Sequence, residues 1–519
     1  MRVESLLERC ASRSPYKTAV VADGRRWTYR ETDRRANRLA HALRDAGVQN
    51  GDRVAVCLDN SAEAVFALFG ILKAGAAVLL INPSTKAEKM AYLLNNSRAK
   101  ALLTDRRKQI EYLGVWGQTP SLAVVYVLGA GADWKEAGKQ FSPLNRVFDD
   151  GDDRPITGTG VGADLAALLY TSGTTGVAKG VMLTHLNLLS ATTSIAGYLE
   201  NTERDVVLTC LPLSFGYGLS QVLTMFLAGG TVVLEKSFLY PYAVLEALRA
   251  EGATGFPLVP TMAAMLLQLD PSSMAFPSLR YLTNAAAPLP LDHLQRLRAV
   301  FPGAKLFSMY GQTECVRVTY LPPDQLDARP SSVGRGMPNQ NVWIEDESGC
   351  TVGPGVTGEL IVQGPHVMEG YWGSPEETEK KLKPSSPSGG KALRTGDLFR
   401  MDDEGYLYFV SRRDDIIKCL GEKVSPREVE DALCAHPYVA EAAVIGVPDA
   451  VLGQSVRAVV SVRNGYPLSP SDLLAHCKKR LEDYMVPKSI VLTRDGLPKS
   501  ANGKIDKRSL ISYFEVSRR

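Results

Sequence analysis

The sequence predicts an α/β protein in which a large N-terminal domain of layered sheets and helices precedes a small α/β domain. At 519 residues the chain is too long for one typical domain. Apolar strand-like runs alternate with helical patterns, which favours parallel strand pairing and a layered arrangement. A charged stretch that begins near residue 410 has the composition of an interdomain linker. We therefore expect one domain over residues 1–411 and a second over residues 412–519.

The composition is that of an ordinary globular protein, with 45% hydrophobic and 22% charged residues. A formal net charge of +3 gives no reason to expect a nucleic-acid partner. The eight cysteines are scattered and form no C-x-x-C pair, which indicates neither a zinc site nor a disulfide framework. The amino terminus has no apolar signal core, and no apolar run reaches the ~18 residues of a membrane span. We expect a soluble, cytoplasmic protein with no membrane span.

In the first third of the chain, strand and helix signals alternate. A capping box from Thr28 to Glu31 opens a helix that ends at Gly47. The sequence then predicts a buried strand at residues 53–58, an apolar helix at 62–72 and a strand at 77–81. It also predicts an irregular surface connection at 130–163, followed by a further strand at 165–170.

The same alternation continues past residue 300. A predicted helix begins at His185 and is followed by strands at residues 206–208 and 231–234. A helix near residues 245–248 and a strand at 281–284 come next. Pro426 predicts the start of another helix, because proline is favoured in the first helical turn. Strands at residues 442–447 and 456–462 and a helix at 471–481 then predict the small C-terminal domain.

A loop rich in glycine, hydroxyl groups and one lysine follows the strand that ends at Tyr170. Glycines let the backbone approach a ligand, hydroxyls and amides donate to oxygens, and an ammonium offsets negative charge, so the loop suits a phosphate. It is not a standard P-loop, because Lys179 lies between Ala178 and Gly180 and lacks the G-K-[ST] ending. A plain solvent loop is the alternative. The candidate phosphate-binding residues are Thr171, Ser172, Gly173, Thr174, Thr175 and Lys179.

The run from Thr171 to Gly180 resembles the phosphate loop of the adenylate-forming superfamily, which includes acyl-CoA synthetases, nonribosomal peptide adenylation domains and luciferases. In that family the loop grips the β- and γ-phosphates of ATP while a carboxylate attacks the α-phosphate. Further motifs occur in the family's order and spacing, so the resemblance covers essentially the whole chain.

Two of these motifs follow apolar strands. The small residues Ala285, Ala286 and Ala287 permit a flat ring to lie against a strand's carboxyl end, and they resemble the family's adenine-contacting segment. A core strand ending in a turn is the alternative. The run from Tyr310 to Glu314 matches the family's Y-G-x-T-E motif. By this resemblance Tyr310 stacks on adenine, Thr313 binds a phosphate and Glu314 holds Mg²⁺.

The remaining motifs lie near the predicted domain boundary and in the C-terminal domain. Asp397 resembles the family's ribose ligand. Arg412 and Asp414 match the hinge motif, with Arg412 near the phosphate or ribose and Asp414 at the pivot, although Ser411 replaces the usual glycine. Lys504 matches the P-x-x-x-x-G-K loop and is the candidate that bridges carboxylate and α-phosphate.

The resemblance implies that carboxylate and Mg·ATP give an acyl-adenylate and pyrophosphate, after which the acyl group passes to a thiol. Coenzyme A and a carrier-protein phosphopantetheine present the same thiol, so both acceptors stay open. It also implies a mobile C-terminal domain, because Lys504 and the phosphate loop lie in different domains. A non-catalytic nucleotide-binding homologue is the alternative, which the joint retention of Lys504, Glu314 and Asp397 disfavours.

The run from Leu211 to Leu219 resembles the segment that opens the family's acyl pocket. Amino-acid-activating members carry an aspartate, which pairs with the substrate's α-ammonium, where this chain has Gly216. Burying an ammonium without a counter-charge costs several kcal/mol. We therefore expect a small fatty or aryl acid rather than an α-amino acid. The candidate pocket residues are Phe215, Gly216, Tyr217, Gly218 and Thr261, with space at the glycines and apolar walls beside them.

Overall fold

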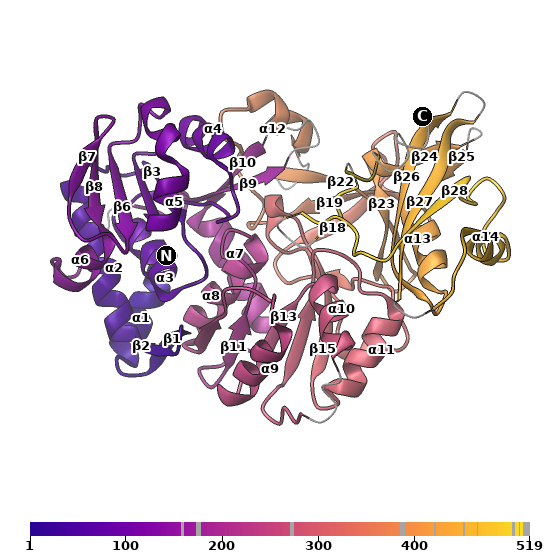
Figure 1. Ribbon diagram of the computed structural model, residues 1–519, viewed down its shortest axis with the longest axis horizontal. Coiled ribbons are helices and arrows are strands. Elements are labelled where there is room, and N and C mark those ends of the chain that lie inside the picture. Colours follow the sequence, from indigo (N-terminus) through magenta and orange to yellow (C-terminus); the bar gives the residue numbers. More distant parts are fainter. Residues whose placement is uncertain are drawn as a thin grey trace.

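A computed structural model shows four β-sheets covered by helices, and it confirms the predicted α/β class (Figure 1). The structure describes residues 1–156, 160–172, 178–269, 274–384, 390–419, 422–449, 452–463, 466–500, 504–507 and 509–511. In Figure 1 the sheet that contains β3, β6 and β8 lies at the left and the sheet of the C-terminal strands lies at the right.

The first nine-stranded sheet forms from strands whose apolar side chains are buried on both faces. Its inner strands pair in parallel, as the alternation of strands and helices predicts. The strand order is β20 (Gly370–Tyr371), β10 (Ala178–Thr184), β9 (Leu165–Ser172), β4 (Ala77–Leu80), β3 (Arg53–Cys57), β5 (Ala101–Asp105), β6 (Val124–Leu128), β8 (Lys139–Pro143) and β7 (Trp134–Glu136).

The second nine-stranded sheet joins the first strands of the chain to strands from its middle. Its central strands are parallel. The order is β17 (Arg335–Gly336), β16 (Thr319–Tyr320), β15 (Lys305–Tyr310), β14 (Tyr281–Asn284), β13 (Gly255–Leu258), β11 (Val206–Thr209), β12 (Thr231–Leu234), β1 (Thr18–Ala22) and β2 (Arg25–Thr28).

Two five-stranded sheets complete the fold. The third has the order β18 (Asn341–Glu345), β19 (Gly358–Gln363), β22 (Lys391–Met401) and β21 (Leu382–Pro384), and β23 (Leu407–Arg412) also pairs with β22. The fourth has the order β25 (Glu422–Val424), β24 (Ile417–Cys419), β27 (Gly453–Val462) and β26 (Val439–Asp449), and β28 (Ser489–Thr493) also pairs with β27. Every strand of the fourth sheet therefore follows Arg412, and this sheet has its own apolar core.

The helices cover the sheets and fill the space between the first two. The predicted capping box at Thr28 and Glu31 is formed, with reciprocal hydrogen bonds. The helices are α1 (Ser5–Arg13), α2 (Tyr29–Asp45), α3 (Ala62–Lys73), α4 (Ala87–Ser97), α5 (Arg106–Glu111), α6 (Leu144–Asp150), α7 (His185–Tyr198), α8 (Gly216–Ala228), α9 (Pro241–Ala250), α10 (Pro260–Gln268), α11 (Leu291–Val300), α12 (Pro375–Lys381), α13 (Pro426–Cys434) and α14 (Pro470–Lys478). The short 3-10 helices are η1 (Leu113–Gln118), η3 (Thr313–Cys315), η4 (Pro323–Gln325), η5 (Arg413–Asp415) and η6 (Ser509–Ile511).

The structure corrects two local predictions. Residues 130–163, predicted to be irregular, contain β7, β8 and α6, because Trp134 stacks on Phe141 and the short hairpin extends the first sheet. Lys179 and Gly180, predicted to be loop residues, belong to β10, which pairs antiparallel with β9. The edge of an existing sheet stabilises these short segments, and a sequence window does not contain that partner.

All eight cysteines are free, and six of them are buried. Within the described residues, we find no helix both long enough and apolar enough to span a membrane.

Candidate functional site

Four neighbouring parallel strands end at one edge of the second sheet, and candidate residues follow each of them. The strands are β11, β13, β14 and β15. The acyl segment follows β11, Thr261 follows β13, the three alanines follow β14, and the Tyr310 motif closes β15. Ligands of open parallel sheets bind at such a carboxyl edge. Segments that are distant in the sequence are therefore brought together here by strand order.

Asp397 is the centre of a hydrogen-bonded cluster between the second and third sheets. The Tyr310 hydroxyl donates to Oδ2 of Asp397 at 2.7 Å, and Gln312 Nε2 donates to the same oxygen at 2.8 Å. Arg412 Nε lies 3.5 Å from Oδ1, because Asp397 on β22 is the register partner of Arg412 on β23. Burial raises the pKa of Tyr310 well above its ordinary value, and the neighbouring Asp397 raises it further. Tyr310 is therefore a hydrogen-bond donor at neutral pH.

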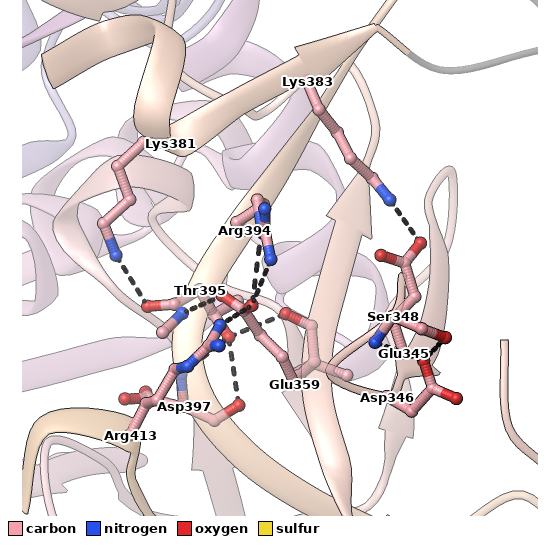
Figure 2. Close-up of polar contacts among 12 residues, drawn as sticks. Glu345, Asp346, Ser348, Glu359, Lys381, Lys383, Arg394, Thr395, Asp397 and Arg413 are labelled. Atoms are coloured by element: carbon pink, nitrogen blue, oxygen red, sulfur yellow. Dashed lines mark hydrogen bonds and ion pairs between the residues drawn. The ribbon is translucent and has the colours of Figure 1, made fainter. Parts of the chain in front are cut away.

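Glu359 supports the backbone that presents Asp397 (Figure 2). One of its carboxylate oxygens accepts the Gly396 backbone N–H at 2.9 Å, and the other lies 3.1 Å from Arg394 and 3.2 Å from Arg413. Gly396 has φ +74°, which glycine adopts without strain. A buried carboxylate with three donors is fully compensated, so this cluster holds the turn before Asp397 rigidly.

Glu314, the candidate magnesium ligand, is oriented by a tyrosine from the neighbouring sheet. The Tyr371 hydroxyl on β20 donates to Oε1 of Glu314 at 2.8 Å. No further hydrogen bond from the described residues reaches this carboxylate, so its second oxygen is available to a ligand. Those residues also contain no cluster of three or more His, Cys, Asp or Glu placed to hold a metal. A single carboxylate fits Mg²⁺ that is bound chiefly by phosphates and water.

Small residues at the end of β14 form a tight turn. Ala286 has φ +75°, a conformation that is costly for any residue with a β-carbon. The Asn284 side-chain amide donates to the Ala287 carbonyl oxygen at 3.1 Å and braces this turn. The predicted adenine-contacting segment is thus a strained turn at the carboxyl edge.

Part of the predicted phosphate loop lies outside the described residues. Gly173, Thr174 and Thr175 fall there, and of Ser172 only the backbone is described. Thr171 is the register partner of Lys179 in the β9–β10 pair. Lys179 forms an ion pair with Glu377 on α12 and lies 5.5 Å from the Tyr371 ring centre. Hydrogen bonds from Lys179 and Lys380 lower the pKa of Glu377 to about 2, so the Glu377 carboxylate is charged at neutral pH.

The C-terminal loop brings Lys504 to the Asp397 cluster. The pKa of Lys504 is lowered, first because the surrounding protein displaces water and second by Arg412, while Asp397 and Glu314 act in the opposite sense. The Lys504 side chain is nevertheless exposed to solvent. The Lys499–Ile505 bridge closes the loop that carries it.

Contacts between the C-terminal elements and the rest of the chain hold this loop over the site. Arg463 lies 3.1 Å from Asp292 on α11, and Arg427 on α13 lies over the ring of Phe409 on β23. Asp414, the predicted pivot, belongs to η5 directly after Arg412; its side chain is outside the described part of the structure.

The predicted acyl segment is only partly as expected. Gly216 opens α8, and a β-carbon there would meet only Leu169 Cδ1 at 3.8 Å, so Gly216 leaves the space that was predicted. Gly218 was predicted to leave space as well, and that is wrong: a β-carbon there would lie 2.2 Å from the Pro212 carbonyl oxygen. Gly218 allows α8 to approach the preceding loop. Phe215 lies edge-on to Tyr217, and no hydrogen bond of the described chain joins either to Thr261.

Tyr217 is anchored on one side and contacts a buried cation on the other. Its hydroxyl bonds to the Thr283 hydroxyl at 2.6 Å and donates to the Thr283 carbonyl oxygen at 2.9 Å. The Arg317 guanidinium lies 4.9 Å from its ring centre. Burial raises the pKa of Tyr217, and the charge on Arg317 opposes that rise. Arg317 itself is only 2% exposed.

Sequence reasoning missed five residues that support or line this site, namely Gln312, Arg317, Glu359, Tyr371 and Glu377. Gln312 occupies the variable position of the Y-G-x-T-E motif, so the motif itself did not mark it. Arg317 had a signal, because an arginine three residues after Glu314 in an apolar run is unusual. Glu359, Tyr371 and Glu377 reach the site only through the pairing and packing of segments that are distant in the sequence, for which the sequence carries no local signal.

Comparison with known proteins gives a consistent result over the length of the chain. A family model described as AMP-binding enzyme matches residues 7–372, and a model of the AMP-binding enzyme C-terminal domain matches residues 428–504. The long-chain-fatty-acid–CoA ligase of Bacillus subtilis (strain 168) is 32% identical over 540 residues, covering 98% of this chain and 94% of the ligase. Feruloyl-CoA synthase of an Amycolatopsis species is 35% identical over 511 residues, covering 98% of each chain.

One relative has been solved both with ATP bound and in its apo form, and the two structures match this chain to different degrees. ATP-bound MatB from Rhodopseudomonas palustris superposes with a TM-score of 0.90 at 30% identity and covers 100% of both chains. The apo form of the same protein, again with both chains covered to 100%, gives 0.79. The arrangement described above is therefore nearer to that of the ATP-bound relative.

Proposed function

Because the chain belongs to the family of AMP-binding enzymes, we propose that it activates a carboxylic acid with ATP and transfers the acyl group to coenzyme A. In the first step a carboxylate oxygen bonds to the α-phosphorus and pyrophosphate leaves. In the second, a thiol sulfur bonds to the carbonyl carbon, the thiol proton is released and AMP leaves. The observation that carries the proposal is the convergence of Tyr310, Asp397, Arg412 and Lys504 at one carboxyl edge.

The roles of these residues follow from their chemistry. Asp397 has acceptor capacity for the two ribose hydroxyls, and Tyr310 offers its ring to adenine. Lys504 is a donor positioned by the C-terminal loop to neutralise charge that gathers at the α-phosphate. Glu314 and Thr313 are oxygen donors suited to Mg²⁺ and phosphate. When bound, Mg²⁺ supplies charge neutralisation along the phosphates.

We also propose that the C-terminal part from residue 412 moves as a unit between the two steps, with Asp414 as the pivot. Lys504 follows the strands of the fourth sheet, whereas the predicted phosphate-binding loop connects β9 and β10 of the first sheet. Lys504 and this loop therefore meet in only one arrangement of the C-terminal part relative to the rest of the chain. The higher similarity to the ATP-bound relative supports the assignment of this arrangement to acyl-adenylate formation.

The acid that fits best has an apolar or aryl body and no α-amino group. The open space at Gly216 holds no carboxylate that would pair with an ammonium. The named relatives act on a long-chain fatty acid and form feruloyl-CoA, which agrees with such a body.

ATP–pyrophosphate exchange driven by a panel of carboxylic acids tests the proposal. We expect exchange with fatty or aryl acids and little with their α-amino counterparts. Absence of exchange with every acid would leave the non-catalytic nucleotide-binding homologue as the better description. The acceptor is then tested by offering coenzyme A and a phosphopantetheine-bearing carrier protein at equal thiol concentration; faster thioester formation on the carrier would replace coenzyme A in the proposal.

A further inference from the structure

We propose that the acid activated by this chain carries a second carboxylate, remote from the reacting one, which pairs with the guanidinium of Arg317. This inference rests on the proposed function and specifies its substrate class. It makes Arg317 a specificity-determining residue of the acyl pocket.

Arg317 is a buried cation without a counter-charge. It is 2% exposed, its Nε has no hydrogen-bond partner, and no ion pair or side-chain hydrogen bond to any described residue engages its guanidinium. A contact with the Tyr217 ring offsets only part of the cost of burying that charge. Buried arginines are normally paired, so the missing partner indicates a ligand.

The other deeply buried cations of the described chain show the usual arrangement. Lys73 lies 2.9 Å from Glu8 and 3.0 Å from Asp33, and Lys108 lies 2.6 Å from Glu111. Lys139 donates to two backbone carbonyl oxygens at 2.8 and 3.1 Å. Arg317 differs from all three, and it alone among them lies beside the candidate active site.

The backbone at Arg317 is also unusual. Val316 has φ +55° and ψ −61°, a conformation that is a genuine outlier for a β-branched residue. The Arg317 N–H donates to the Cys315 carbonyl oxygen across it, which closes a γ-turn of the rare, strained kind. Strain of this kind persists at ligand sites, where the surrounding structure determines the conformation. Here the strained residue, Val316, lies two positions after Glu314 and sets the direction in which the chain continues to Arg317.

The position of Arg317 specifies where the second carboxylate must lie. Its guanidinium lies over the ring of Tyr217 in the first turn of α8. Hydrogen bonds between the Tyr217 hydroxyl and Thr283 hold that ring in place. The reacting carboxylate must lie at the phosphates near Glu314, so the paired carboxylate is at the other end of the acid. The aromatic walls of Phe215 and Tyr217 suit an apolar body between the two. A planar guanidinium binds a carboxylate through two parallel hydrogen bonds, which makes the recognition selective.

Pairs of acids with the same number of carbon atoms test the proposal in ATP–pyrophosphate exchange, for example hexanoate against adipate and 4-methylbenzoate against terephthalate. We expect wild-type kcat/KM to favour the dicarboxylic member of a pair by about tenfold or more, as for a charge-assisted contact. Arg317→Met reverses the preference, and Arg317→Lys keeps part of it. Arg35→Met is the control, because Arg35 also lies over an aromatic ring, that of Trp27 at 4.3 Å, but far along the chain and with Asp149 as partner.

Thermal unfolding provides a second measurement that does not depend on turnover. Removing an uncompensated buried charge should raise the Tm of Arg317→Met, and adipate or terephthalate should raise the Tm of the wild type but not of this variant. A lowered Tm in Arg317→Met would mean that groups of this chain already compensate the Arg317 charge, which would overturn the proposal.

The outcomes separate this inference from the proposed function. Exchange with monocarboxylic acids that exceeds exchange with their dicarboxylic partners leaves the function intact and overturns the role of Arg317. An equal loss for both members of each pair in Arg317→Met assigns the residue to the reacting carboxylate or the phosphates, which also overturns it. Failure of every acid overturns the function itself.

Discussion

The hydroxyl of Tyr310 donates to Oδ2 of Asp397 at 2.7 Å, which joins two residues that are 87 positions apart and belong to different sheets. Gln312 donates to the same oxygen and Arg412 lies on the other side of the carboxylate, so the Asp397 side chain is held in one orientation. A preorganised carboxylate loses little freedom on binding a sugar.

Asp397→Asn should raise the KM for ATP by about 10–100-fold, because it removes a charge-assisted acceptor while keeping the size of the side chain. The KM for the acid should change little. Pyrophosphate exchange at varied ATP concentration measures both. Asp403→Asn, in the exposed turn beyond β22, is the control and should behave as wild type. An unchanged KM for ATP would remove Asp397 from the nucleotide site.

Lys504→Ala should slow acyl-adenylate formation by about 100-fold or more, since one positioned donor to transition-state charge is lost. Thioester formation from a supplied acyl-adenylate should survive, because that step builds no charge at the α-phosphate. Lys499→Ala is the control on the same loop; Lys499 pairs with Glu441 at 2.8 Å and should affect neither step. Equal losses in both steps would contradict the role of Lys504.

Asp414→Pro should leave adenylation largely intact and slow transfer to the thiol, because proline fixes φ at the predicted pivot within η5. Asp414→Ala, which keeps the backbone free, should transfer at nearly the wild-type rate. Single-turnover kinetics of the two steps distinguish the variants. If the proline variant transfers as fast as the alanine variant, the pivot lies elsewhere.

Gly216→Asp should weaken exchange with unsubstituted acids, by placing a carboxylate where the chain has open space. A β-carbon fits at this position, since only Leu169 Cδ1, at 3.8 Å, lies near it. Pairs of acids with and without an α-amino group measure the effect. Gly197→Asp on the exposed face of α7 is the control. A wild-type preference for the amino forms would show that another residue supplies the missing aspartate.

Glu4→Gln should stabilise the protein above pH 7. Burial raises the pKa of Glu4 from 4.5 to about 7, although Arg2 lies 2.9 Å away. The folded state therefore binds a proton that the unfolded state releases, so this group's contribution to stability is complete below pH 4.5 and is lost as the pH rises to 7. The loss amounts to at most about 3 kcal/mol.

Urea unfolding of wild type and Glu4→Gln at pH 4.5 and pH 8 measures that difference. The pKa of His185, lowered to about 4 by burial, changes stability in the opposite sense between pH 4 and 6.5, and its Nδ1 lies 3.6 Å from Glu4 Oε2. Glu88→Gln, at an exposed position on α4, is the control. A constant difference between Glu4→Gln and wild type at both pH values would contradict the raised pKa.

The sequence predicts best what short motifs contain. Asp397 and Tyr310 were identified separately, each from a local run of residues, and the structure shows that they share a hydrogen bond. Glu359 was not predicted, because its contact with Gly396 depends on the register between β19 and β22. Register between strands is set by packing across the sheet, and a single strand does not encode it.

Two of the corrected predictions, the irregular segment 130–163 and the open space at Gly218, have a related physical origin. The β7–β8 hairpin is too short to be stable alone and forms against β6. Gly218 was interpreted as open space because a glycine has no side chain, yet it is surrounded by the Pro212 backbone. A glycine can leave open space or allow a close contact with another backbone segment. Only the folded chain shows which of the two applies at a given position.

The register that sets Asp397 opposite Arg412 also determines where the chain accepts added length. The hydrogen-bonded ladder between β22 and β23 fixes the distance between Asp397 and Arg412. That distance therefore does not depend on the number of residues in the turn that connects the two strands. Asp403 and Glu404 at that turn are exposed. A peptide label inserted between them lengthens the loop outward and leaves the strand pairing in place. This turn is therefore a site for a fluorescent or affinity tag, from which the proposed movement of the C-terminal part can be tested.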